Sequence, residues 1–239
     1  MNILGLDSSG MVASAALLTE EILAGEYTIN HKLTHSQTLL SMLDQMLKMA
    51  ELTIEEIDLI AVAAGPGSFT GLRIGASTAK GLGLALDKPL VPVPTVDGLS
   101  YNLLGCGTYV CPMMDARRQQ VYTGIYFDEG NRQKTVLAQT AMSVEDIAGK
   151  LNALTETDPQ ASVIVLGDGV PVYREKLEKL LELPWREAPA HLSRQRAGAV
   201  AVLGLELFRA GKSCTADEFV PEYLRLSQAE RERAQKETP

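Results

Sequence analysis

The sequence predicts an α/β fold of two lobes, because one structural unit occurs twice along the chain. In each unit an apolar strand ends at an aspartate, a polar turn follows, and a second strand returns. The unit is centred first on Asp7 and then on Asp115. Between them, residues 88–95 form a proline-punctuated extended segment typical of a crossover. We therefore expect duplicated mixed sheets flanked by helices, although aspartate turns occur in many unrelated α/β hairpins.

The first half of the chain alternates strand and helix patterns. Apolar runs at 2–6 and 12–18 enclose Asp7-Ser8-Ser9-Gly10 and predict a hairpin. Residues 37–50 carry apolar side chains at helical spacing, with Thr34 or Ser36 as the candidate N-cap. The expected elements that follow are a short helix after Thr53, a buried strand at 59–64, and a glycine-rich loop at 65–71 that opens a helix ending near residue 86.

The second half repeats the order and ends in a charged tail. The expected elements are strands at 109–114 and 121–127, a helix at 144–154, a strand at 162–166, and helices at 173–183 and 198–210. The expected divisions are a first lobe at 1–99 completed by a C-terminal helical segment at 194–226, a second, degenerate lobe at 100–193, and a flexible tail at 227–239.

Composition and charge exclude several classes of protein. The 239 residues are 46% hydrophobic, which is enough for a substantial core. Cys106, Cys111 and Cys214 form no CxxC or Cys/His cluster, which favours a reducing compartment over disulfides or zinc. No leader-like segment and no run of eighteen uncharged apolar residues are present, so we expect a cytoplasmic chain without membrane spans. A net charge of -8 repels a phosphate backbone, so any RNA is expected to be held mainly by a partner.

Three stretches carry a resemblance to a known family. They are NILGLDSSG at the start, AVAAGPGSFTGLRIGASTAKGL at 61–82, and PEYLRLSQAERE near the end. Together they resemble the TsaB (YeaZ-like) family, which lies in the actin, sugar kinase and Hsp70-like ATPase (ASKHA) superfamily. The resemblance covers most of the chain, and the glycine-rich middle stretch is its most specific part.

The resemblance implies a two-lobed actin-like fold and an accessory role. Family members are paralogues of TsaD, the subunit that transfers a threonylcarbamoyl group to adenosine in tRNAs reading codons that begin with A. They are regarded as non-catalytic scaffolds that dimerise with TsaD and join TsaE, an ATP-hydrolysing subunit. The resemblance thus implies a TsaD-type partner, a TsaE-type partner and an indirect relation to tRNA.

The polar turns are candidate nucleotide or anion sites. The candidate residues are Asp7, Ser8 and Ser9 in the first turn, Gly67, Ser68 and Arg73 at the start of the following helix, and Asp115 in the second turn. Aspartates after strands can face metal-bound phosphate, and helix N-termini favour anions. The alternatives are a self-bonded turn and a structural strand-to-helix elbow. Because Arg117 and Arg118 stand where a phosphate loop needs glycine, we expect no catalytic residue and no cofactor required by this chain, with ATP or ADP only at a complex interface.

Two helices are candidate partner surfaces. The candidate residues are Leu39, Leu43, Met46 and Leu47 on the first helix, and Gly75, Ala79 and Gly83 on the second. Methionines 42, 46 and 49 add adaptable apolar surface, and the small residues form a flat helix face. The alternative for both stripes is the core of the chain itself. An uncovered apolar face would also favour a homodimer when the partner is absent.

The sequence motifs give less support to other classes of enzyme. His31 and His35 have HxxxH spacing, but the histidine pair of the TsaD-type paralogue follows the Gly-Pro-Gly helix, and residues 89–104 contain no histidine. We therefore expect no metal site. No Gly-x-Ser-x-Gly motif is present. The remaining alternatives are an independent ATP-binding kinase or ATPase that uses Asp7 and Asp115, and a metallopeptidase of the glycoprotease-like family.

Overall fold

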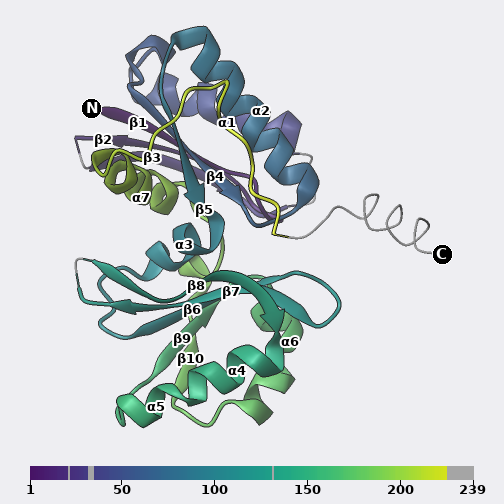
Figure 1. Cartoon of the computed structure of the whole chain (residues 1–239). Coiled ribbons are helices and arrows are strands. Elements are labelled where there is room, and N and C mark those ends of the chain that lie inside the picture. Colours follow the sequence, from purple (N-terminus) through teal and green to yellow (C-terminus); the bar gives the residue numbers. More distant parts are fainter. Residues whose placement is uncertain (21, 32–34, 131, 225–239) are drawn as a thin grey trace, which may run out of the picture.

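The computed structural model describes residues 1–20, 22–31, 35–130 and 132–224. Two lobes lie one above the other in Figure 1, and each is built on a five-stranded sheet. The sequence-predicted α/β fold with duplicated mixed sheets is confirmed.

The first sheet has the strand order β3-β2-β1-β4-β5. Its strands are β1 (Asn2–Asp7), β2 (Ala13–Thr19), β3 (Ile22–Ile29), β4 (Leu59–Gly65) and β5 (Leu90–Pro94). β1 pairs antiparallel with β2, with Asp7 opposite Ser14, and parallel with β4. The predicted first hairpin is therefore correct. Strand β3 is not predicted from the sequence, because it is a largely exposed edge strand without a clean apolar alternation.

The second sheet repeats this topology. Its strands are β6 (Tyr109–Asp115), β7 (Gln120–Asp128), β8 (Gln133–Ser143), β9 (Val163–Leu166) and β10 (Trp185–Glu187). Read from β8, the order is β8-β7-β6-β9-β10, in which each strand takes the place of its counterpart in the first sheet. β6 and β9 are parallel, as are β1 and β4. Asp7 and Asp115 therefore end equivalent strands.

Helices cover both faces of the first sheet. α1 (His35–Met49) and α2 (Phe69–Leu86) pack on one face, and α7 (Ala197–Arg209) packs on the other. The strand residues alternate between these two layers, since Leu4 joins the α1 and α2 cluster while Ile3 joins the α7 cluster. The remaining helices are η1 (Ile54–Glu56), α3 (Thr95–Ser100), η2 (Tyr101–Leu103), α4 (Val144–Asn152), α5 (Leu154–Thr157), α6 (Gly169–Leu180) and η3 (Ala190–Leu192).

The short helix α3 joins the lobes. Val96 and Leu99 are buried with Tyr126 of the second sheet, and the Tyr126 hydroxyl donates to Asp97 Oδ1 at 2.5 Å. Burial raises the Asp97 pKa, while the Tyr126 hydrogen bond lowers it. The predicted lobe boundary at residue 99 falls inside α3, a helix that contacts both sheets.

Of the segment expected to be helical at 194–226, the described part, which ends at residue 224, is helical only in α7. After Gly211, whose φ is +75°, the chain extends along the first lobe (Figure 1). Cys214 and Leu90 exchange two backbone hydrogen bonds of 2.9 Å, and Phe219 is buried. We call residues 214–224 the C-terminal strap. Long-range pairing and Pro221 oppose helix here, so the helical prediction is wrong for residues 210–224. The predicted tail at 227–239 lies outside the described residues.

Candidate functional site at the two aspartate turns

The first turn is closed on itself by Asp7. The side chain of Asp7 is only 2% exposed, and its Oδ1 accepts hydrogen bonds from Ser9 N at 2.8 Å and Ser9 Oγ at 2.7 Å. Burial raises the pKa of Asp7 to about 6, while the Ser9 bonds and the His35 charge oppose the rise. Its bonds to Ser9 are those of an aspartate that stabilises its own turn.

The glycine-rich loop is packed directly against this turn. Ser68 N donates to Ser9 O at 2.7 Å, and Ser8 Oγ donates to Gly71 O at 2.9 Å. A Cβ atom on Gly67 or Gly71 would collide with the carbonyl oxygen of Ser9 or Ser8. These glycines therefore permit close backbone packing between β1 and α2, which is the elbow interpretation of the motif.

The first-lobe candidates come together except for Arg73. Ser68 N-caps α2 by accepting from Gly71 N at 3.4 Å. Arg73 lies one turn further, with its guanidinium 4.0 Å from the centre of the Phe69 ring. Phe69 in turn packs on Tyr223 of the C-terminal strap, with ring centres 4.8 Å apart. Arg73 thus makes a cation–π interaction with Phe69.

The second turn repeats the bond pattern of the first. Asp115 Oδ1 accepts from Arg117 N at 2.8 Å, the same two-residue spacing as Asp7 and Ser9. It also accepts from the Tyr173 hydroxyl at 3.1 Å, and Asp115 Oδ2 lies 3.3 Å from Arg117 Nη1. Asp115 N donates to Asp168 Oδ1 at 3.1 Å. The Asp115 carboxylate is therefore already engaged in holding its own hairpin.

The residues after Asp115 adopt an unusual backbone. Arg117, Arg118 and Gln119 have φ values of 64°, 54° and 61°, in the left-handed region. Residues other than glycine normally enter this region singly, at a cost of roughly 1–2 kcal/mol per residue. The sequence shows that glycine is missing here, but its pattern does not predict three consecutive left-handed residues. No local signal identifies such a turn, because its geometry is set by contacts with α6.

The predicted interface side chains of α1 lie inside the chain. Leu39, Leu43, Met46 and Leu47 are at most 5% exposed and pack against the first sheet. The prediction that these side chains contact a partner is therefore corrected. They form part of the core of the chain itself, which was the alternative interpretation. The sheet covers this face because it carries five of the seven Leu and Met residues of α1. Leu40 and Met49, which are 53% and 78% exposed, lie on the outside.

The predicted small-residue face of α2 also points inward. Gly75, Ala79 and Gly83 are buried, and a Cβ on Gly83 would meet Leu90 of β5. This prediction is corrected for the same reason as that for α1: the chain's own sheet takes up the flat face. A second small-residue stripe, absent from the sequence interpretation, lies on the opposite side.

The outer face of α2 consists of exposed residues at helical spacing. Ser77, Gly81 and Ala85 follow one another at intervals of four and are all exposed, with Leu84 59% exposed beside them. Gly81 has open space where a Cβ would stand. We call Ser77, Gly81, Leu84 and Ala85 the α2 outer face. Small residues in this arrangement allow a second backbone to approach closely.

The described residues form neither a cluster suited to a metal ion nor a helix suited to a membrane. In residues 1–20, 22–31, 35–130 and 132–224, no group of three or more His, Cys, Asp or Glu side chains is arranged to hold a metal ion. His35 Nε2 lies 2.9 Å from Gly10 O. Among the same residues, no helix has both the length and the apolar character that a membrane crossing requires.

A hollow of about 230 Å³ lies in the second lobe at the carboxyl end of β9. Its polar lining includes Arg174, Glu187 and Arg194. Arg174 Nε pairs with Glu187 Oε1 at 2.7 Å, and Arg194 Nη1 donates to Gly167 O at 3.0 Å. None of the sequence-predicted nucleotide residues lines this hollow.

The duplicated sheets and paired aspartate turns define the class of protein as a two-lobed, actin-like ATPase and sugar kinase fold. A ROK hexokinase from Thermus thermophilus superposes with a TM-score of 0.51 at 11% identity, covering 88% of this chain and 100% of the hexokinase chain. A Pseudomonas aeruginosa protein described as similar to peptidase YEAZ superposes with a TM-score of 0.80 at 26% identity, over 94% of this chain and 99% of that one.

Sequence comparisons identify the family. The family model for tRNA N6-adenosine threonylcarbamoyltransferase, TsaD, matches residues 26–233. The tRNA threonylcarbamoyladenosine biosynthesis protein TsaB of Bacillus subtilis is 32% identical over 96% of both chains, and that of Escherichia coli is 25% identical over 94% of this chain and 95% of its own. The chain belongs to the TsaD-related family and, within it, to the TsaB group.

Proposed function

We propose that this chain is a cytoplasmic, non-catalytic subunit required for threonylcarbamoyl transfer to adenosine in tRNAs that read codons beginning with A. It acts by dimerising with a TsaD-type catalytic paralogue and by recruiting a TsaE-type ATPase. The observation that carries the proposal is a contrast between two regions. The two aspartate turns are engaged in internal contacts, whereas the α2 outer face is exposed and suited to close packing.

The internal bonds of the turns support a non-catalytic role. Asp7 is buried and bonded to Ser9, and Asp115 is bonded to Arg117 and Tyr173. A carboxylate that accepts such bonds has fewer free lone pairs for a magnesium ion or its waters. The chain therefore needs no cofactor of its own. ATP or ADP is expected only where a partner completes the site.

The α2 outer face fits a partner with the same fold. A paralogue has its own counterpart of α2, so the two helices can pack about a pseudo-twofold axis. Gly81 lies at the centre of the stripe, where a crossing helix comes closest, and Leu84 supplies an exposed apolar contact. The same face supports a homodimer when the paralogue is absent.

The acidic character of the chain supports indirect contact with tRNA. A net charge of -8 opposes the dense phosphate contacts that hold an RNA by its backbone. In the proposed complex, the partner subunits therefore provide most of the tRNA affinity. This chain contributes by holding the catalytic paralogue in its working arrangement.

The test is Gly81→Leu. The substitution points into open space in the isolated chain, so the fold is retained, but it blocks close approach of a partner helix. Gly149→Leu on α4 is the matched control, because a Cβ there also meets no atom within 4 Å. The variants are mixed with the TsaD and TsaE homologues of the same genome, and complex formation is measured by light scattering and tRNA modification by nucleoside analysis.

We expect Gly81→Leu to weaken the complex at least about tenfold, a loss of roughly 1.4 kcal/mol, and to reduce tRNA modification in proportion. Gly149→Leu should behave like the parent chain. A Gly81→Leu chain that still forms the complex would reject the α2 outer face as the docking surface. Modification that proceeds equally well with no copy of this chain would reject the accessory role itself.

A further inference from the structure

We propose that helix α3 is a pin that holds the two lobes together as one rigid body, so that the lobes do not close on each other as hinged domains do. Two domains of one chain normally move relative to one another unless the interface between them is large and apolar. Hinge closure around a ligand is one common form of that motion. The proposal concerns the isolated chain and does not depend on the accessory role.

The first support is the burial of α3 between the two sheets (Figure 1). Val96 and Leu99 are at most 2% exposed and belong to an apolar cluster with the second sheet. Toward the first lobe, a Cβ on Gly98 would stand 3.4 Å from Val200 of α7, which covers the first sheet. Ser100, a polar residue at the end of the helix, is also fully buried. Both lobes therefore pack directly on α3, and close packing of this kind resists sliding.

The second support is the bonding of α3 to the second sheet. Gln133 Nε2 of β8 donates to Ser100 O at 3.0 Å, and Ser100 Oγ lies 2.6 Å from Gln133 Oε1. The hydroxyl of Tyr126 on β7 donates to Asp97 Oδ1 at 2.5 Å. Breaking such bonds leaves buried or half-buried polar groups without partners, which is costly away from water. The helix is therefore fixed to two strands of the second sheet.

The third support is the link between two crossovers of the chain. The first crossover runs through α3 and η2 into β6, and the second runs from η3 into α7. Asn102 of η2 joins them, because its Nδ2 donates to Leu192 O at 2.9 Å and to Arg194 O at 2.6 Å. Beside it, the Tyr101 hydroxyl donates to Glu206 Oε2 of α7 at 2.8 Å. A rotation of one lobe against the other would have to break the bonds at both crossovers together.

A pinned junction is the opposite of a hinge. Hinges are formed by a few loop or element-terminal residues that absorb large changes of φ and ψ. Here the segment between the lobes is helical through α3 and η2, and its side chains are bonded to both lobes. The chain therefore presents its two lobes in one fixed orientation, and little conformational freedom remains to be lost when another molecule binds.

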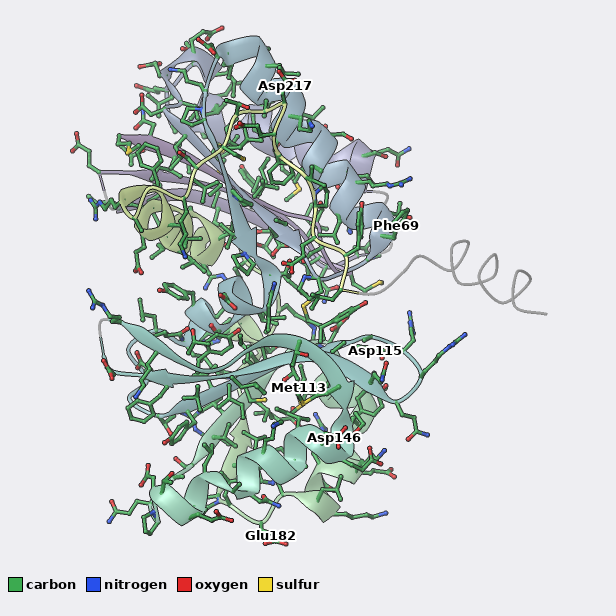
Figure 2. The ribbon with its side chains drawn as sticks, in the orientation of Figure 1. Phe69, Met113, Asp115, Asp146, Glu182 and Asp217 are labelled. Carbon is green, nitrogen blue, oxygen red and sulfur yellow. The ribbon has the colours of Figure 1, made fainter. Side chains whose placement is uncertain are left out.

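The direct test measures the distance between the two ends of the full chain. Asp217 of the strap and Glu182 of the second lobe are exposed and lie near opposite ends of the molecule (Figure 2). Nitroxide labels are attached at both positions through a genetically encoded amino acid, which leaves the three native cysteines unmodified. The distance is then measured by double electron–electron resonance. We expect one narrow distance distribution, unchanged by Mg-ATP.

The pin is then weakened by combining Asn102→Ala and Gln133→Ala in one chain. We expect the distance distribution to become at least about twofold broader, because freed lobes move collectively. Asn2→Ala is the matched control and should leave the distribution unchanged, since Asn2 Nδ2 donates to Glu56 O at 3.0 Å within the first lobe. A broad or multiple distribution in the parent chain, a shift on addition of Mg-ATP, or an unchanged distribution in the double variant would overturn the proposal.

Hydrogen exchange of the parent chain tests the pin without any substitution. The amides of Val96 and Tyr101 donate to Gln139 Oε1 and Asp97 O. We expect both amides to exchange as slowly as those of the buried strand β4, because a pin opens only when the whole chain unfolds. Much faster exchange at either amide would show that α3 opens by itself, which is the behaviour of a hinge and contradicts a rigid junction.

Discussion

At each of the two turns, an aspartate ends a central strand, and its carboxylate accepts hydrogen bonds from groups of the same chain. Asp7 and Asp115 each end a central strand and each accept a backbone N–H from two residues further on. They differ in what surrounds them. Asp7 is covered by the loop that opens α2, whereas the hairpin after Asp115 is exposed and carries Arg118.

Burial of Asp7 makes stability depend on pH in a defined direction. Its pKa of about 6 lies above the ordinary 3.8, so the folded chain holds the proton more tightly than the unfolded chain. The favourable contribution is complete below about pH 4 and is lost as the pH rises to about 6. Above that the buried charge costs roughly 3 kcal/mol, from about 1.4 kcal/mol per pH unit.

We therefore expect Asp7→Asn, which carries no charge at any pH, to gain stability relative to the parent chain as the pH rises. The gain between pH 4 and pH 7.5 should be roughly 2–3 kcal/mol, measured by urea unfolding at both values. Asp217→Asn, at an exposed position, should show no such change. A relative stability of Asp7→Asn that does not vary with pH would contradict the buried-charge account.

At the scale of elements, α2 has two faces made of small residues and only one of them is covered. Gly71, Gly75 and Gly83 lie against the chain's own backbone and side chains, whereas Gly81 faces open space. Helical periodicity is the same for both stripes. The difference arises from the sheet and the aspartate turn, which occupy one side of the helix.

The two faces should respond oppositely to alanine. Gly81→Ala is expected to stabilise the chain by about 0.5–1 kcal/mol, because alanine favours helix and meets no neighbour. Gly71→Ala is expected to destabilise it by about 1–3 kcal/mol, since the new methyl group would press on the Ser8 carbonyl, which is backbone. Thermal and urea unfolding of the two variants measure the change in the free energy of unfolding. Equal effects would mean that the packing of the loop on the turn is misassigned.

At the scale of the whole molecule, Gln139 of β8 ties the second lobe to the first lobe and to the C-terminal strap. Its Nε2 donates to Gly65 O at 3.3 Å and to Glu222 Oε2 at 3.0 Å, and its Oε1 accepts from Val96 N at 3.4 Å. Glu222 N also donates to Ala64 O at 2.7 Å. Four segments distant in sequence thus meet at one amide side chain.

Gln139→Ala should loosen this junction. We expect a loss of about 1–3 kcal/mol in stability, because partly buried backbone groups lose their partners. Hydrogen exchange should accelerate at the amides of Val96 and Glu222 and remain unchanged in α4. Gln160→Ala, at an exposed position, is the control. Unchanged exchange at both amides would show that the strap and α3 are held without Gln139.

The sequence by itself determined the repeated unit, in which a strand ends at an aspartate and a second strand returns. It also determined the main helices and the buried strands β4 and β9. These features depend on local periodicity and turn chemistry, which a single segment carries within itself. The family resemblance rests on the same contiguous stretches. Edge strands β3 and β8 escaped detection, because half-exposed strands mix polar and apolar residues without a clean alternation.

Only the tertiary structure decided which helix faces are free, where the last helix ends and how the second turn is bent. The stripe of Gly75 and the stripe of Gly81 have the same helical spacing. The rest of the first lobe covers the stripe of Gly75 and leaves the stripe of Gly81 exposed. The strap lies along the first lobe because Leu90 and Ala64 offer backbone partners. The left-handed turn exists because α6 anchors it from outside its own sequence. Each of these three features depends on contacts between residues far apart in the chain. A local sequence pattern does not show which other segment will pack against it.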